Sequence, residues 1–145
     1  CSAWEEMLTD EIITALQDSE MFRDLPSKQL QRIREAGKEL SFTVGSELVV
    51  EGEGAGRFFL ILAGNVDVTV NGMKRATLGP GKSLGEIALL DGGPRSATVT
   101  AVTDVRTFSL TSWNFRPFLN EESVTQAVIK LLCQRLRSAE KSAYS

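Results

Sequence analysis

The residues best suited to hold a charged ligand lie in one stretch, residues 84–99. Here Gly85 and Glu86 precede an apolar segment long enough for about one helical turn. Arg95 then follows the turn sequence Asp91-Gly92-Gly93-Pro94. The first N–H groups of a helical turn are free to bind an anion, and a glycine lets the backbone approach it closely. A guanidinium can grip a phosphate with two hydrogen bonds, so this stretch favours an anionic ligand.

Glu86 adds a second chemistry beside the predicted anion site. Its carboxylate repels a bare phosphate, but it can accept a hydrogen bond from a sugar hydroxyl, as an acidic residue does for ribose in dinucleotide folds. A phosphate binder next to a sugar binder indicates a nucleotide. A structural interpretation is also open, because a glutamate at a helix start interacts favourably with the helix dipole and an arginine after a proline is commonly a solvated surface residue.

The composition of the chain restricts the alternatives. A chain of 145 residues, 42% hydrophobic and 24% charged, is typical of one globular domain. The formal net charge of −3 argues against a nucleic-acid binder, and no apolar run approaches the roughly 20 residues that span a bilayer. The chain has no histidine, which excludes His-based acid–base catalysis and most zinc sites. We therefore expect no enzyme, no metal and no cofactor.

Two zones precede and surround the ligand-binding stretch. Residues 1–36 show helical periodicity, with Trp4, Leu8, Ile12 and Leu16 four positions apart. Residues 37–110 show many short strands separated by turns, which indicates a barrel or jelly roll. Within this zone Asn71-Gly72 follows an alternating strand, and that dipeptide is a strong signal for a β-hairpin.

The third zone, residues 111–145, returns to helical periodicity. Its apolar stripe consists of Val124, Ala127, Val128, Leu131, Leu132 and Leu136. Cys133 lies within this pattern, and we expect it to be buried as a small hydrophobe. The predicted fold is α+β and mainly β: one domain over residues 1–145, with an antiparallel β-roll flanked by N-terminal helices and a C-terminal helix.

The sequence Gly85 to Leu90, followed by Pro94 to Val99, resembles the phosphate-binding cassette of the cyclic-nucleotide-binding domain family. That family includes bacterial catabolite activators, regulatory subunits of cAMP-dependent kinase and cyclic-nucleotide-regulated channels. The resemblance extends over about residues 22–140. It includes Phe22, Leu25 and Leu30 in the helical segment, and Gly45, Gly52, Phe58 to Gly64 and Val66 in the barrel. One departure is Leu84, where many members carry phenylalanine.

The resemblance implies a regulatory domain that binds a cyclic nucleotide, with cAMP favoured over cGMP. The ligand-binding residues that it implies are Gly85, Glu86, Ile87, Ala88, Arg95, Ser96 and Ala97. Among them, Glu86 would bind the ribose 2′-hydroxyl and Arg95 the cyclic phosphate. Backbone N–H groups of Ala88, Ser96 and Ala97 would complete the phosphate site. The C-terminal helix would cover the base, with Leu132, Arg135 and Leu136 as candidate lid residues.

We expect the C-terminal helix to pass the binding signal to an effector region of a parent protein. The expected location is the cytoplasm, either alone or as the cytosolic part of a larger membrane protein. Three alternatives stay open. The domain can have lost its ligand and serve as a scaffold, although the intact Glu86 and Arg95 count against this. A cupin-like metal enzyme generally uses histidine ligands, and a transcription factor needs a DNA-binding motif, whereas only nine residues follow Leu136.

Overall fold

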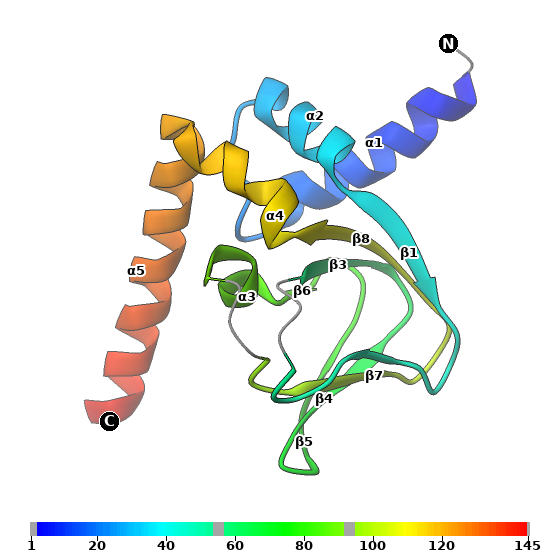
Figure 1. Ribbon diagram of the computed structural model, residues 1–145, viewed down its shortest axis with the longest axis vertical. Coiled ribbons are helices and arrows are strands. Elements are labelled where there is room, and N and C mark those ends of the chain that lie inside the picture. Colours follow the sequence, from blue (N-terminus) through cyan, green and yellow to red (C-terminus); the bar gives the residue numbers. More distant parts are fainter. Residues whose placement is uncertain (1–2, 54–56, 92–94, 145) are drawn as a thin grey trace.

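A computed structural model of the chain describes residues 3–53, 57–91 and 95–144 (Figure 1). Helices α1 (Ala3–Asp18) and α2 (Ser27–Ala36) open the chain. The strands are β1 (Lys38–Phe42), β2 (Glu47–Val49), β3 (Arg57–Ala63), β4 (Val66–Val70), β5 (Met73–Leu78), β6 (Ser83–Leu84), β7 (Thr98–Ala101) and β8 (Val105–Thr111). The short helix α3 (Glu86–Asp91) lies between β6 and β7. The chain continues through α4 (Ser112–Phe115), the 3₁₀-helix η1 (Arg116–Asn120) and α5 (Glu122–Tyr144).

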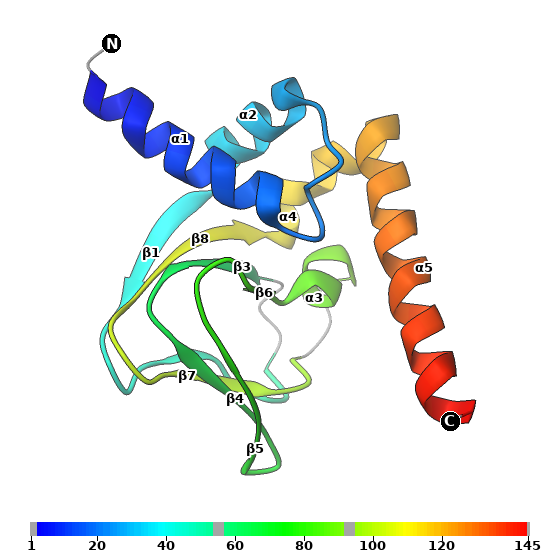
Figure 2. The ribbon, with the colours of Figure 1, turned by 180° about the vertical axis from the view of Figure 1, so that it is seen from behind.

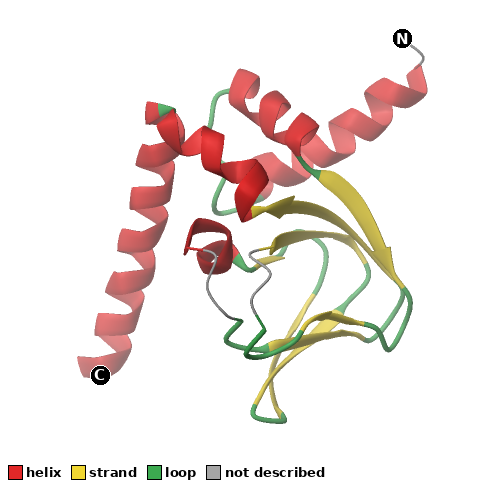
Figure 3. Cartoon of the chain, in the orientation of Figure 1, coloured by secondary structure: helices red, strands yellow, loops and turns green. Residues whose placement is uncertain are grey.

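The strands form two antiparallel sheets, with strand orders β1-β8-β3-β6 and β2-β7-β4-β5 (Figure 3). Residues from both sheets, among them Phe59, Val66 and Val99, pack together in one apolar cluster inside the roll. Helices α1, α2 and α4 lie at one end of the roll, and α5 runs from that end along the side of the molecule (Figure 1). The predicted fold class, a β-roll flanked by helices, is confirmed.

Strand β3 is buried on both faces, which accounts for its unbroken apolar sequence. Phe58 and Leu60 belong to the core cluster beneath the helices, whereas Phe59 and Ile61 belong to the cluster inside the roll. Side chains alternate between the two faces of a strand, so a single strand contributes to both cores. The helices therefore pack directly on the strand that also forms the wall of the roll.

The hairpin predicted at Asn71-Gly72 joins β4 and β5. Val66 pairs with Leu78 at its open end. Asn71 has φ 52° and Gly72 has φ 78°, and positive φ at both central residues is what a type I′ turn requires. The prediction is confirmed, and its physical basis is the tolerance of asparagine and glycine for left-handed backbone conformations.

The apolar stripe predicted for the C-terminal helix divides in α5. Val124, Val128 and Leu131 are buried in the helical core, whereas Leu136 is 64% exposed. The first part of α5 packs near η1 and the segment that joins α1 to α2, and the helix then extends past them (Figure 2). Cys133 is exposed, so the prediction that it is buried is wrong. It lies where α5 has left the helical core.

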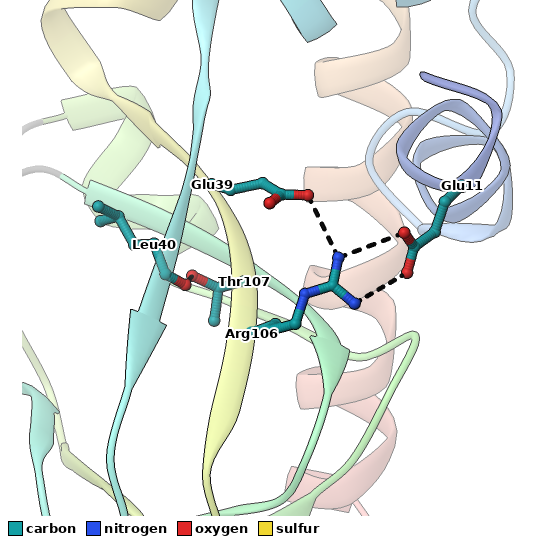
Figure 4. Close-up of polar contacts among 5 residues, drawn as sticks. All are labelled: Glu11, Glu39, Leu40, Arg106 and Thr107. Atoms are coloured by element: carbon teal, nitrogen blue, oxygen red, sulfur yellow. Dashed lines mark hydrogen bonds and ion pairs between the residues drawn. The ribbon is translucent and has the colours of Figure 1, made fainter. Parts of the chain in front are cut away.

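Polar contacts connect α1 and β1 to β8 (Figure 4). Arg106 donates hydrogen bonds to both carboxylate oxygens of Glu11, at 3.3 and 3.2 Å, and one to Glu39 at 3.3 Å. The hydrogen bond with Glu11 is the largest cause that raises the pKa of Arg106. These side chains are 41–42% exposed, so solvent screens their attraction. By contrast, Ile12 on α1 is 0% exposed.

We predict that packing, rather than this ion-pair cluster, holds α1 in place. Ile12→Ala should lower the free energy of unfolding by about 2–5 kcal/mol, the usual cost of truncating a buried aliphatic side chain. Arg106→Gln should lower it by about 0–1 kcal/mol, the range for exposed ion pairs. Denaturant titrations of both variants test this ranking. A loss for Arg106→Gln as large as that for Ile12→Ala would contradict it.

Candidate functional site

A cavity of about 400 Å³ lies where the two sheets, the α3 segment and α5 meet, and this volume is within the range of small-molecule sites. Its apolar walls come from Val49, Val68, Leu78, Leu84 and Val99, and its polar groups from Ser83, Glu86, Arg95, Ser96 and Arg135. Apolar side chains with a few converging polar groups are typical of a site for an organic molecule that carries charge.

The short helix α3 brings Glu86 to the cavity. It begins at Glu86, as the single helical turn predicted from the sequence requires. The Leu89 N–H donates to the Gly85 carbonyl at 2.9 Å, and the Leu89 side chain is buried in the core beneath the helices. Packing of Leu89 in the core therefore fixes the position of α3, and with it the position of Glu86.

Arg95 is held by the loop between β2 and β3. Its backbone N–H donates to the Glu53 carbonyl and its own carbonyl accepts from the Gly52 N–H, both at 2.9 Å. Its side chain donates through Nη2 to the Arg57 carbonyl. These contacts place the guanidinium against the start of β3, on the wall of the cavity.

The guanidinium of Arg95 is prepared for an anion. The residue is only 7% exposed, and among the described residues its buried Nε has no hydrogen-bond partner. Burial lowers the pKa of Arg95, the positive charge of Arg57 lowers it further, and the negative charge of Glu86 opposes both. A buried cation with an unused donor and a second cation nearby gains strongly from a negative ligand.

The Glu86 carboxylate is 9% exposed and has a partner on each oxygen. Ser83 Oγ donates to Oε1 at 2.5 Å. Arg135 Nη2 on α5 forms an ion pair with Oε2 at 3.5 Å, and it also lies 3.6 Å from Glu20 Oε2. Through Arg135, the C-terminal helix reaches the carboxylate that the sequence predicts to bind a sugar.

The structure brings most of the predicted site residues together. Gly85, Glu86, Arg95, Ser96, Ala97 and Arg135 line the same cavity. Ile87 and Ala88 lie in α3, but their side chains and the turn at 92–94 lie outside the described residues, as do the side chains of Trp4 and Leu8. Leu132 and Leu136 do not line the cavity and are 36% and 64% exposed. Their role as a lid stays a prediction for a ligand-bound state.

Sequence reasoning missed several residues at this site, chiefly Ser83 and Arg57. Ser83 precedes Glu86 by three residues, but it lies on β6 and α3 begins at Glu86 itself, so no helix-start pattern signals the contact between the two side chains. Arg57 shares the alternation of Phe59 and Ile61, which places it on the inner face of β3. Its side chain donates to Ser109 Oγ at 3.1 Å.

Comparisons with known proteins point to one family. Residues 39–122 match the cyclic nucleotide-binding domain. The cAMP-dependent protein kinase regulatory subunit of Debaryomyces hansenii is 31% identical over 121 residues, which cover 82% of this chain and 27% of that protein. A second such subunit, from Candida albicans, is 32% identical over 73% of this chain and 23% of that protein. The chain thus spans about a quarter of the length of the curated relatives it matches.

Solved structures resemble the whole fold. The N-terminal domain of a transcriptional regulator from Streptomyces coelicolor A3(2) superposes with a TM-score of 0.80 and 28% identity, covering 89% of this chain and 94% of that chain. The regulatory domain of Toxoplasma gondii PKA with cAMP gives a TM-score of 0.72 and 28% identity, covering 77% and 44%. In the part of this chain that the structure describes, no helix is both long and apolar enough to cross a membrane.

The close approach at Gly85 yields a prediction. A Cβ there would overlap Arg95 Nη1 and the Arg57 carbonyl oxygen, whereas at Gly81, with nearly the same positive φ, it would meet nothing within 4 Å. Both alanine variants carry about 1–2 kcal/mol of left-handed strain. Gly85→Ala should lower the free energy of unfolding by about 1–3 kcal/mol more than Gly81→Ala, because overlap with the Arg57 backbone adds to the left-handed strain. Equal losses in denaturant titrations would show that the contact at Gly85 does not constrain this residue.

Proposed function

The chain belongs to the cyclic nucleotide-binding domain family, a family of regulatory rather than catalytic domains, and we propose that its cavity binds cAMP. One observation carries the proposal: a buried guanidinium, Arg95, and a buried carboxylate, Glu86, face the same partly apolar cavity. A cyclic nucleotide offers the matching groups, since it has an anionic phosphate, a neighbouring 2′-hydroxyl and an apolar base.

Each part of the proposed ligand has a counterpart in the cavity. Arg95 binds the cyclic phosphate, and the negative charge offsets the repulsion between Arg95 and Arg57. Backbone N–H groups of Ala88, Ser96 and Ala97 add donors to the same phosphate. Glu86 accepts a hydrogen bond from the ribose 2′-hydroxyl, because an ionised carboxylate has acceptor capacity beyond its two present partners.

The choice of cAMP is supported by the relatives, because similar domains are cAMP-dependent kinase regulatory subunits and structures with cAMP. cGMP is the second candidate. Ser96 is an exposed residue that lines the cavity. Its hydroxyl can accept a hydrogen bond from the guanine amino group. We propose that the domain binds its ligand without transforming it, since the chain contains no histidine for acid–base chemistry.

We also propose that α5 transmits binding to an effector region of a longer protein. Arg135 on α5 pairs with Glu86 in the cavity and with Glu20 in the segment between α1 and α2. A ribose hydroxyl on Glu86 changes the first of these contacts, so the ligand has a different interaction energy with different positions of α5. Such a difference is the requirement for a ligand to shift a conformational equilibrium.

The binding proposal predicts ligand-linked stability. cAMP at 100 times its dissociation constant should stabilise the fold by about 2.7 kcal/mol, which raises the melting temperature by several degrees. Non-cyclic 5′-AMP at the same concentration should give a smaller shift, because it lacks the cyclic ester. A folded domain whose melting temperature responds to neither cAMP nor cGMP would favour the scaffold alternative.

The role of Arg95 predicts a selective loss of affinity. Arg95→Gln should weaken cAMP binding at least about tenfold, because a hydrogen bond to a charged group contributes about 1.5–3 kcal/mol. Arg75→Gln is the matched control, since Arg75 is an exposed arginine on β5 that does not line the cavity. Calorimetric titrations compare the variants, and equal affinities for both would remove Arg95 from the binding site.

The role of α5 predicts a change of distance. A spectroscopic label on the exposed Cys133 and a second on Met73→Cys at the exposed hairpin, in a Cys1→Ser background, report the separation of α5 from the roll. Saturating cAMP should shorten this distance, because the helix moves toward the occupied cavity. The same concentration of 5′-AMP serves as control. An unchanged distance with cAMP bound would contradict transmission through α5.

A further inference from the structure

The shortest polar contact of Glu86 joins it to Ser83, three residues before it in the chain. Ser83 Oγ donates to Glu86 Oε1 at 2.5 Å. Ser83 lies on β6, where it pairs with Leu60 of β3, and Leu60 is 0% exposed. The hydroxyl therefore ties the carboxylate to β6, which pairs with β3, the strand that contributes to both cores of the molecule.

The second oxygen of the same carboxylate faces a different kind of partner. Arg135 approaches Oε2 at 3.5 Å from α5, with a side chain 39% exposed and shared with Glu20. A contact this long, from a partly solvated side chain on a helix that extends past the core, restrains a carboxylate weakly. Of the two partners, Ser83 is the one that defines where the carboxylate oxygens lie.

We propose that Ser83 is a positioning residue that holds the Glu86 carboxylate ready for the ribose 2′-hydroxyl, and so sets the preference for ribose over 2′-deoxyribose. This inference rests on the proposed function. Ser83 uses its single O–H donor in a hydrogen bond to Oε1. The carboxylate oxygens have further lone pairs, and these can accept a hydrogen bond from the sugar. Without Ser83 the carboxylate has to be ordered by the ligand itself, which weakens binding.

A purely structural role for Ser83 makes a different prediction. If the hydroxyl only stabilises the start of α3, its removal weakens every ligand of the cavity alike. If it positions Glu86, its removal weakens cAMP and leaves 2′-deoxy-cAMP, which lacks the hydroxyl, nearly unaffected. The ratio of the two dissociation constants separates these roles, and a general loss of stability does not move it.

The experiment measures dissociation constants of cAMP and 2′-deoxy-cAMP by calorimetry for the wild type and three variants. Ser83→Ala should weaken cAMP about two- to tenfold, the cost of ordering one side chain on binding, and 2′-deoxy-cAMP less than about twofold. Ser83→Thr keeps the hydroxyl and should restore the wild-type ratio. Thr77→Ala is the matched control. Thr77 Oγ1 donates to a carboxylate oxygen of Asp67 at a distance of 2.8 Å, and neither residue lines the cavity.

The outcomes are distinguishable. A folded wild type that binds neither nucleotide overturns the proposed function itself. A wild type that binds both equally, or a Ser83→Ala variant that keeps the wild-type ratio or loses both ligands equally, leaves the proposed function standing and overturns the role of Ser83. Ser83→Cys, isosteric and with a weak donor, supplies the same ratio if melting shows that Ser83→Ala does not fold.

Discussion

Burial of the Arg95 guanidinium is the constraint around which the cavity is arranged. Removing a cation from water is costly unless hydrogen bonds and opposite charge replace the lost hydration. Here the replacements are the Arg57 carbonyl and the nearby carboxylate of Glu86, while Nε has no partner among the described residues. Gly85 supplies the space, because a side chain there would overlap the guanidinium. The positive charge of Arg95 is thus only partly compensated by the protein, and a bound anion would complete the compensation.

The two cores give the parts of the molecule different rigidity. Strand β3 contributes Phe58 and Leu60 to the core beneath the helices and Phe59 and Ile61 to the interior of the roll, so this strand, which pairs with β6 beside the cavity, cannot shift without disturbing both. Helix α5 is buried over its first turns and meets the cavity through Arg135, whose two ion pairs are long and partly solvated. Such contacts contribute little free energy, so α5 is held chiefly by the buried residues of its first turns, and its later part is tied to the cavity only weakly.

The sequence predicts what depends on neighbouring residues and misses what depends on distant ones. The hairpin at Asn71-Gly72 and the helical turn at Glu86 follow from local backbone preferences, and both are present. The periodicity of the last helix shows which residues share a face, but not where the surface beneath that face ends, so Cys133 was wrongly placed in the core. Likewise, the contact of Arg95 with the Arg57 carbonyl spans 38 positions of the chain, and no local pattern encodes it.

The two charged groups of the cavity divide the consequences of binding between the roll and the helix. Arg95 contacts residues of the roll and its loops, namely Gly52, Glu53 and Arg57. Glu86 contacts Ser83 on the roll and Arg135 on α5. In the proposed complex, the phosphate therefore acts on a residue that, in the described part of the chain, contacts the roll and its loops but not α5, and it contributes chiefly affinity. The sugar acts on the carboxylate that also pairs with Arg135 of the helix. We infer that affinity and transmission are carried by two neighbouring groups of one small ligand, because Arg95 contacts the roll and its loops, whereas Glu86 also contacts α5 through Arg135.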